Sequence, residues 1–359
     1  MNTIGDAKHD LLTPCLCLDR KVLQGNIQRM ADFLAPGKVR IRPHSKTHKC
    51  PAIAHMQLEA GAIGITCAKL SEAQVMVEAG IRDILIANQI VDPSKLRQLA
   101  GLARYTQVMV AVETAANASA LSEAAVAAGS TIRVLIEVEV GMGRCGVAPE
   151  DTLALARHIL VLPGLAFEGL MGYEGHAVML PEKGERTRVA GEAMARLVGT
   201  RDMLEAAGIG VGIVSGGGSG TYDVTGVYPG LTEIQAGSYA TMDAKYRSVG
   251  LEFGYALTLL AQVLSVHGDV AITDAGLKSL SSEFGMPTVL APQGWELERL
   301  AEEHGFLRRQ GGEALAVGDK VELVPSHGCT AINLHEHYAV TEDDRLIGYW
   351  PIAARGCIQ

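Results

Sequence analysis

The sequence lacks the features that mark membrane, secreted and nucleic-acid-binding proteins. No apolar run reaches the roughly 18 residues of a spanning helix, and the N-terminus has no signal-peptide pattern. The 31 basic residues are outnumbered by 40 acidic ones, and no basic block occurs, so neither nucleic acid nor membrane is an expected partner. Seven cysteines are an odd number without the spacing of a disulfide framework, which predicts a reduced, cytoplasmic protein.

Aromatic residues are also scarce, at 4% of the chain, whereas 41 residues are glycine. This balance suits an α/β enzyme with glycine-rich loops better than a β-sandwich. Hydrophobic residues make up 48% and charged residues 20%, which excludes intrinsic disorder. A length of 359 residues predicts about two domains.

Short apolar runs alternate with segments of helical period over residues 20–250, such as Ser71–Ala79 and Glu113–Ala128. Eight such units predict a TIM-type (β/α)8 barrel, with an open doubly wound sheet as the rival fold. The expected strands begin near Val39, Ala62, Asp83, Thr106, Thr131, Ala166, Val211 and Leu231.

The pattern changes to short alternating strands after about residue 250, with one helix expected over Gly294–His304. The opening segment PCLCLD alternates as well and is expected to pair with the C-terminal sheet. We therefore predict a β-rich second domain built from residues 1–19 and 251–359.

Polar and glycine-rich clusters follow the predicted barrel strands, at the end where enzymes of this fold place their active sites. Arg144 follows the fifth strand, and Tyr173 and His176 follow the sixth. Glycine-rich segments after the seventh and eighth strands stand where this fold commonly binds phosphate. They are SGGGSGT (215–221) and Gly237-Ser238-Tyr239.

The segment RPHSKTHK crowds basic and imidazole groups around Lys46, which favours an uncharged, nucleophilic amine. A nucleophilic lysine beside a phosphate site suggests pyridoxal phosphate. The segment GMGRCG (141–146) matches the G-x-G-x-x-G pattern of dinucleotide binding, which leaves a nicotinamide dehydrogenase as an alternative. The expected helix starts only near Pro149, and Arg144 occupies the loop, so the match is weak.

His327 and Cys329 are two residues apart in VPSHGCT, so on a strand both side chains would share one face. An imidazole and a thiolate suit zinc, with water or a carboxylate completing the site. His335 and His337 repeat the spacing. All four are equally consistent with ordinary strand residues.

Seven blocks in this order resemble the D-threonine aldolase and D-serine dehydratase family, pyridoxal-phosphate enzymes of the alanine-racemase fold (fold type III). The resemblance runs from about residue 12 to the end of the chain. The blocks are RPHSKTHKCP, GMGRCGV, SGGGSGTY, QAGSYATMD, TDAGLKSLSSEFGMP, VPSHGCTAINLHEHY and WPIAARG.

The resemblance implies a homodimer with active sites at the subunit interface and a D-amino acid substrate. It implies Lys46 as the Schiff-base lysine and places Arg144 and Tyr173 beside the cofactor ring. It implies a divalent metal at His327 and Cys329, with zinc favoured over manganese or magnesium. It assigns the cofactor phosphate to Ser215, Gly218, Ser219, Gly220, Thr221, Gly237, Ser238 and Tyr239.

The metal pair separates the subgroups of this family. His-x-Cys, as at His327 and Cys329, resembles the dehydratases, whereas aldolases carry His-x-Asp. We therefore expect a dehydratase that releases a 2-oxo acid and ammonia from a D-3-hydroxy amino acid. The alternative is an aldolase that releases glycine and an aldehyde, with His176 as the base. An amino-acid racemase and a non-catalytic pyridoxal-phosphate carrier are further alternatives.

Overall fold

The computed structural model describes residues 2–359, which divide into two compact units. One unit comprises the chain up to Arg29, Thr47–Ile53 and Ser238–Gly356; the other comprises Met30–Lys46, Ala54–Gly237 and Cys357–Gln359. The first boundary between the two units lies between Arg29 and Met30, inside helix α1 (Arg20–Leu34). Our boundaries of 20–250 and 251–359 therefore stay a prediction.

The larger unit is built on a parallel sheet of eight strands in the order β2-β9-β8-β7-β6-β5-β4-β3. Its two ends are joined, because His44 bridges Thr66 of β3 and the Ser45 amide donates to the Thr66 carbonyl at 2.8 Å. This confirms the predicted eight-stranded α/β architecture and excludes the open sheet. The strands are β2 (Arg40–Ile41), β3 (Ile65–Cys67), β4 (Asp83–Gln89), β5 (Gln107–Val112), β6 (Ile132–Glu137), β7 (Leu165–Met171), β8 (Ile213–Gly216) and β9 (Glu233–Ile234).

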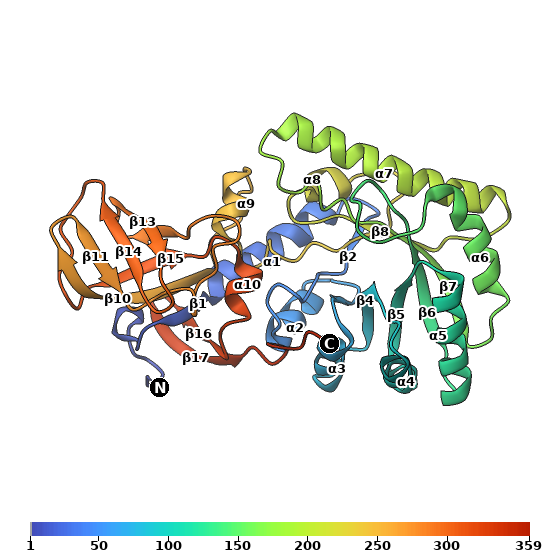
Figure 1. The fold of residues 1–359 in the computed structure, drawn as a ribbon, viewed down its shortest axis with the longest axis horizontal. Coiled ribbons are helices and arrows are strands. Elements are labelled where there is room, and N and C mark those ends of the chain that lie inside the picture. The colour runs from blue at the N-terminus through green and yellow to red at the C-terminus, as the bar shows by residue number, and fades with distance from the viewer. Residues whose placement is uncertain (1) are drawn as a thin grey trace. The chain divides into compact units, whose positions relative to one another are not determined.

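Helices connect these strands, and α5 and α6 run beside β6 and β7 in Figure 1. Their ends follow sequence signals: Asp92 caps α4 just before a proline, and Thr114 caps α5. The segments predicted at Ser71–Ala79 and Glu113–Ala128 are confirmed as helices. The helices are α2 (Pro51–Glu59), α3 (Leu70–Glu78), α4 (Pro93–Leu102), α5 (Ala115–Ala128), η2 (Pro149–Asp151), α6 (Thr152–Leu160), α7 (Lys183–Ala206) and α8 (Tyr222–Thr225).

The interior of this unit is filled by alternate residues of the central strands. Apolar side chains from β4, β5, β6 and β7 form one buried cluster inside the sheet. The loops at the carboxyl ends of these strands therefore sit on a rigid frame, which is where the polar clusters of the sequence lie. The cluster consists of Leu85, Met109, Ala111, Leu135 and Met171.

The other unit is a β-domain with one nine-stranded sheet. β1 (Cys15–Asp19) lies between β10 and β16, which confirms that PCLCLD joins the C-terminal sheet. The remaining strands are β10 (Leu257–His267), β11 (Val270–Thr273), β12 (Thr288–Ala291), β13 (Trp295–Leu300), β14 (Gly305–Arg309), β15 (Lys320–Val324), β16 (His337–Glu342) and β17 (Arg345–Pro351). The short helices are η1 (Lys8–Asp10), α9 (Ala244–Ser248) and α10 (Gly328–Ile332).

The helix predicted over Gly294–His304 is wrong, because this segment contains β13, which pairs with β14. Its glutamates, arginine and leucines favour a helix by composition. The side chains nevertheless alternate: Trp295 and Leu297 are buried, and Glu296 and Glu298 are exposed. Burial of the alternate residues against the sheet outweighs the local helix preference.

No helix among residues 2–359 is both long and apolar enough to cross a membrane.

Candidate active site

Three residues predicted to surround a cofactor ring converge in the larger unit. Lys46 follows β2, and its ammonium nitrogen lies 5.7 Å from the ring centre of Tyr173. The guanidinium carbon of Arg144, on the loop after β6, lies 5.8 Å from the same ring. Lys46 is partly exposed although its neighbours from Ile41 to Cys50 are buried. The geometry therefore leaves an accessible amine beside an aromatic ring and a second cation.

The glycine-rich segment after β8 packs against the same tyrosine. A side chain at Gly218 would crowd the Tyr173 ring, and one at Gly220 would overlap the carbonyl oxygen of Val178. Gly217 has φ +77°, a conformation that only glycine adopts readily. The missing side chains thus create a close backbone cradle next to the lysine. A half-buried lysine, an aromatic ring and a glycine cradle fit pyridoxal phosphate.

Two amides of this cradle are already occupied by Glu174, a residue that the sequence analysis missed. Gly217 N–H donates to Glu174 Oε2 at 3.1 Å, and Gly218 N–H donates to Oε1 at 3.2 Å. The Thr221 hydroxyl also donates to Oε1. Glu174 is fully buried, and burial raises its pKa although these hydrogen bonds oppose the rise. The predicted phosphate ligands Gly218 and Thr221 are therefore bound to an internal carboxylate.

The basic segment around Lys46 is less crowded with positive charge than the sequence suggested. Arg42 is buried and forms ion pairs with Glu233 and Asp83. The predicted phosphate ligand Ser215 joins the same network, because its hydroxyl donates to Glu233 Oε1 at 2.9 Å. The positive charge of Arg42 is therefore balanced by carboxylates, which weakens the argument that this arginine activates Lys46.

His176 lies exposed on the loop after β7, close to Gly141. A side chain at Gly141 would come within 3.2 Å of the His176 Nε2, so glycine leaves room for the ring. An exposed imidazole on this edge of the sheet is available to exchange protons with a small molecule.

The G-x-G-x-x-G match does not form a dinucleotide loop. The amides of Gly141 and Gly143 donate to the Glu139 carboxylate at 2.8 and 3.0 Å. Regular helix begins only at Thr152, so no helix N-terminus faces these glycines. The loop holds Arg144 instead, whose guanidinium lies 3.5 Å from Glu137.

The second predicted phosphate segment divides at the boundary between the units, after Gly237. In the β-domain, the Ser238 hydroxyl lies 3.5 Å from that of Thr47, the residue after Lys46 in the chain. Tyr239 is buried, with its ring centre 5.6 Å from that of Phe253. Tyr239 thus contributes to the core of its unit.

The predicted metal pair comes together in the β-domain, but not on a strand. His327 is extended and directly precedes α10, and Cys329 lies in the first turn of that helix. The two side chains are within hydrogen-bonding reach of each other. The strand argument for this pair is therefore wrong, and the beginning of a short helix brings the two groups together instead.

Asp243 orients the imidazole of this pair and was not anticipated from the sequence. The buried Asp243 accepts a hydrogen bond from His327 Nδ1 at 3.1 Å and from the Gly328 amide at 3.0 Å. Burial would lower the pKa of His327, but the Cys329 sulfur and Asp243 raise it to about 10. A carboxylate on one imidazole nitrogen is the usual support for a metal ligand at the other.

Hydroxyl groups surround the sulfur of this pair. The Cys329 thiol donates to the Thr47 hydroxyl at 3.3 Å, and Ser238 Oγ lies 3.8 Å from the sulfur. Within residues 2–359 no cluster of three or more His, Cys, Asp or Glu side chains is arranged to hold a metal ion. The pair fits a metal only if water or substrate supplies the remaining ligands.

The other two histidines of this region differ from the pair. His335 is partly buried and its Nε2 hydrogen-bonds the Ser279 carbonyl at 2.8 Å. Burial lowers the pKa of His335. His337 begins β16 and pairs with Pro351. The repeated spacing in the sequence therefore does not mark a second metal pair.

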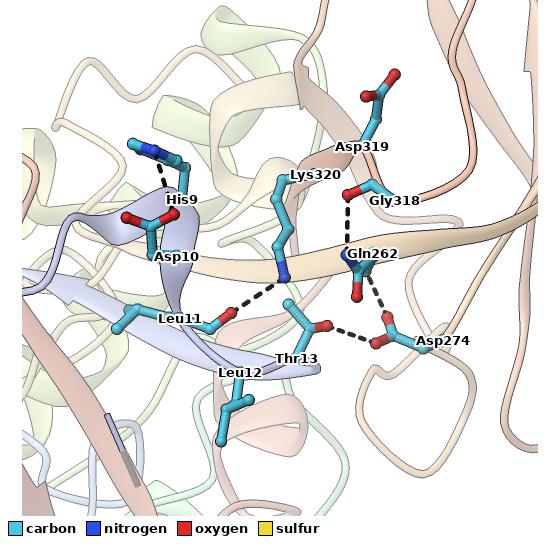
Figure 2. Close-up of a pocket in the computed structure, with 10 residues that line it drawn as sticks. All are labelled: His9, Asp10, Leu11, Leu12, Thr13, Gln262, Asp274, Gly318, Asp319 and Lys320. Atoms are coloured by element: carbon cyan, nitrogen blue, oxygen red, sulfur yellow. Dashed lines mark hydrogen bonds and ion pairs between the residues drawn. The ribbon is translucent and has the colours of Figure 1, made fainter. Parts of the chain in front are cut away.

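A separate open pocket of about 690 Å³ lies in the β-domain, as Figure 2 shows. Its polar side chains form hydrogen bonds within the pocket: Thr13 donates to Asp274 at 2.6 Å, and Lys320 donates to the backbone carbonyl of Leu11 at 3.1 Å. None of the residues lining it is a predicted site residue. This pocket is therefore not part of the candidate active site.

Comparison with known proteins identifies the family of this chain. The family model "Alanine racemase, N-terminal domain" matches residues 18–245, and "Putative serine dehydratase domain" matches residues 256–341. A D-threonine aldolase from Arthrobacter sp is 41% identical over 98% of this chain and 95% of its own.

Two solved structures extend the likeness to the whole fold. D-threonine aldolase from Filomicrobium marinum has a TM-score of 0.97 and 37% identity, with 100% of both chains covered. D-threo-3-hydroxyaspartate dehydratase from Delftia sp. HT23 has a TM-score of 0.89 and 29% identity, covering 96% of this chain and 98% of that one. The family and fold expected from the sequence are confirmed. The chain therefore belongs to the D-threonine aldolase and D-serine dehydratase family, pyridoxal-phosphate-dependent lyases of D-hydroxy amino acids with the alanine-racemase fold.

Proposed function

We propose that the protein is an aldolase that cleaves D-3-hydroxy amino acids into glycine and an aldehyde. The observation that carries this proposal is the full-length similarity to two D-threonine aldolases, at 41% and 37% identity, against 29% for the dehydratase. The TM-scores of 0.97 and 0.89 point the same way. The proposal thus prefers the aldolase to the dehydratase, whereas the metal pair alone led us to expect the dehydratase.

Lys46, Tyr173 and Arg144 are the residues that we assign to the cofactor ring. Pyridoxal phosphate, when bound, supplies an electron-withdrawing ring that accepts the electrons released as a bond at the substrate Cα breaks. Lys46 would hold the cofactor through its amine, and Tyr173, whose ring centre lies 5.7 Å from that amine, would lie beside it. Arg144 lies 5.8 Å from the Tyr173 ring centre and adds a permanent positive charge to the same place.

We assign the cofactor phosphate to those residues of the glycine segment that do not bond to Glu174. Because Glu174 takes the Gly217 and Gly218 amides, we assign the phosphate to Ser219 and Gly220.

His176 is the base that we assign to the substrate hydroxyl. Cleavage of the Cα–Cβ bond requires that the β-hydroxyl lose its proton as the aldehyde forms. Imidazole is the most frequent general base in enzymes, and His176 is exposed on the loop that also carries Tyr173. General-base catalysis of this kind is worth roughly 10²- to 10⁴-fold in rate.

His327 and Cys329 are the side chains that we assign to a divalent metal, with zinc favoured by the imidazole and sulfur donors. A metal ion there would supply a Lewis acid for an oxygen of the substrate. Asp243 holds the imidazole by its Nδ1 and so leaves Nε2 for the metal.

The second candidate function is dehydration, and Cys329 is the observation that favours it. The family resemblance associates His-x-Cys with the dehydratases. In that reaction Lys46 removes the Cα proton and the β-hydroxyl departs, so His176 has no hydroxyl proton to remove. The two reactions therefore use the same residues in different ways.

The products distinguish the two functions. The protein, with pyridoxal phosphate and Zn²⁺ or Mn²⁺, is incubated separately with D-threonine, D-serine and D-threo-3-hydroxyaspartate. We expect glycine and the matching aldehyde from D-threonine, with little ammonia from any substrate. Ammonia and a 2-oxo acid as the main products would refute the aldolase and establish the dehydratase.

A further inference from the structure

We propose that Glu174 is a positioning residue that holds the glycine segment 217–221 in the shape that binds the cofactor phosphate. This inference rests on the proposed function, because it assumes that the segment receives a phosphate. Glu174 lies on the loop after β7, directly after Tyr173, whereas the glycine segment follows β8. The carboxylate therefore joins the two loops that border the cofactor position.

Glu174 contacts both the beginning and the end of the segment. Its two oxygens accept the amides of Gly217 and Gly218 and the hydroxyl of Thr221. Thr221 in turn accepts a hydrogen bond from the Gly218 amide at 3.2 Å. Both ends of the five-residue segment are thus fixed to one side chain.

Consecutive glycine amides that point to one place form a concave site for an anion. Here the protein fills that place with its own carboxylate. Glu174 is fully buried, so any rotation of this backbone would leave a buried carboxylate and a buried N–H without partners. The segment is therefore rigid on the side of Glu174, and its remaining residues are held ready for a ligand.

Close packing on the other side restricts the segment further. A side chain at Gly217 would crowd Thr225 and Ile234, and one at Gly220 would overlap Val178. The backbone has little freedom between these contacts and Glu174. Replacing the Glu174 carboxylate should therefore weaken binding of the cofactor phosphate, without changing the attachment to Lys46 or the packing beside Tyr173.

The test compares two aldehydes, pyridoxal phosphate and pyridoxal, which differ only in the phosphate. Both are titrated into the cofactor-free protein, and binding is followed by absorbance of the lysine-linked form and by protein fluorescence. We expect Glu174→Gln to weaken pyridoxal phosphate binding about tenfold or more, since an amide offers the glycine N–H groups only one oxygen. Pyridoxal binding should remain close to that of the unchanged protein.

Glu182→Gln is the matched control. Glu182 also accepts two backbone amides, those of Gly184 and Glu185, but it is exposed at the start of α7. This variant should keep the preference for pyridoxal phosphate over pyridoxal. Circular dichroism and thermal melting check that each variant is folded.

Three outcomes would overturn the inference. Glu174→Gln could keep the full preference for pyridoxal phosphate, or it could lose both aldehydes equally, as a purely structural role predicts. If Glu174→Gln does not fold, Glu174→Asp is measured, and an unchanged preference there also refutes it. If the unchanged protein binds neither aldehyde to a lysine, the proposed function itself fails, so the two failures are distinguishable.

Discussion

Lys46→Ala is expected to abolish the absorbance of the lysine-linked cofactor and to lower the cleavage rate on the order of 10³-fold or more. The amine of Lys46 lies beside the Tyr173 ring, on a segment whose other residues are buried. Loss of the nucleophile removes the covalent attachment, whereas the fold loses only one partly exposed side chain. The spectrum of the protein with pyridoxal phosphate measures the first effect, and product formation measures the second.

Lys46→Arg is the control for charge. A guanidinium keeps the cation near Tyr173 but cannot form the covalent link. It should therefore lose the absorbance as completely as Lys46→Ala, with a melting temperature close to that of the unchanged protein. A persistent lysine-linked band in either variant would assign the attachment to another amine.

His327→Gln is expected to lower activity at least about 10²-fold, because a Lewis acid is worth several kcal/mol of transition-state stabilisation. The affinity for divalent metal should fall with it, while the lysine-linked absorbance should remain. Titration of the chelator-treated protein with Co²⁺, followed by visible absorbance, measures the metal affinity.

His335→Gln provides a histidine of the same unit that does not contact the metal pair. His335 is partly buried, and its Nε2 hydrogen-bonds the Ser279 carbonyl. Its replacement should leave Co²⁺ affinity unchanged even if it lowers the melting temperature. Equal Co²⁺ affinity in His327→Gln and the unchanged protein would remove His327 from the metal site.

The barrel strands could be predicted because the central ones contain short apolar runs that are buried, such as Val108–Val112 in β5 and Val134–Ile136 in β6. The convergence of Lys46, Arg144 and Tyr173 could be predicted because this fold collects the carboxyl ends of its strands at one edge, whereas their roles stay a prediction. The segment Gly294–His304 was misassigned, since its residues favour a helix locally and only pairing with β14 makes it a strand.

Glu174 and Asp243 could not be found from the sequence. The sequence does not distinguish a glutamate at this position that faces solvent from one that accepts hydrogen bonds from two glycine amides of another loop. Asp243 carries a weak signal as the cap of α9, where it accepts the Tyr246 amide at 2.8 Å. Its bond to His327 spans 84 residues of sequence and depends on the tertiary fold.

The bond broken at the substrate Cα tests the central proposal most directly. Aldol cleavage breaks Cα–Cβ and keeps the Cα–H bond, whereas dehydration starts by removing the Cα hydrogen. D-threonine labelled with deuterium at Cα is therefore converted, and the products are analysed by mass spectrometry. The account predicts glycine that retains one deuterium per molecule, together with unlabelled acetaldehyde. Release of the deuterium to water, with ammonia and a 2-oxo acid, would contradict it.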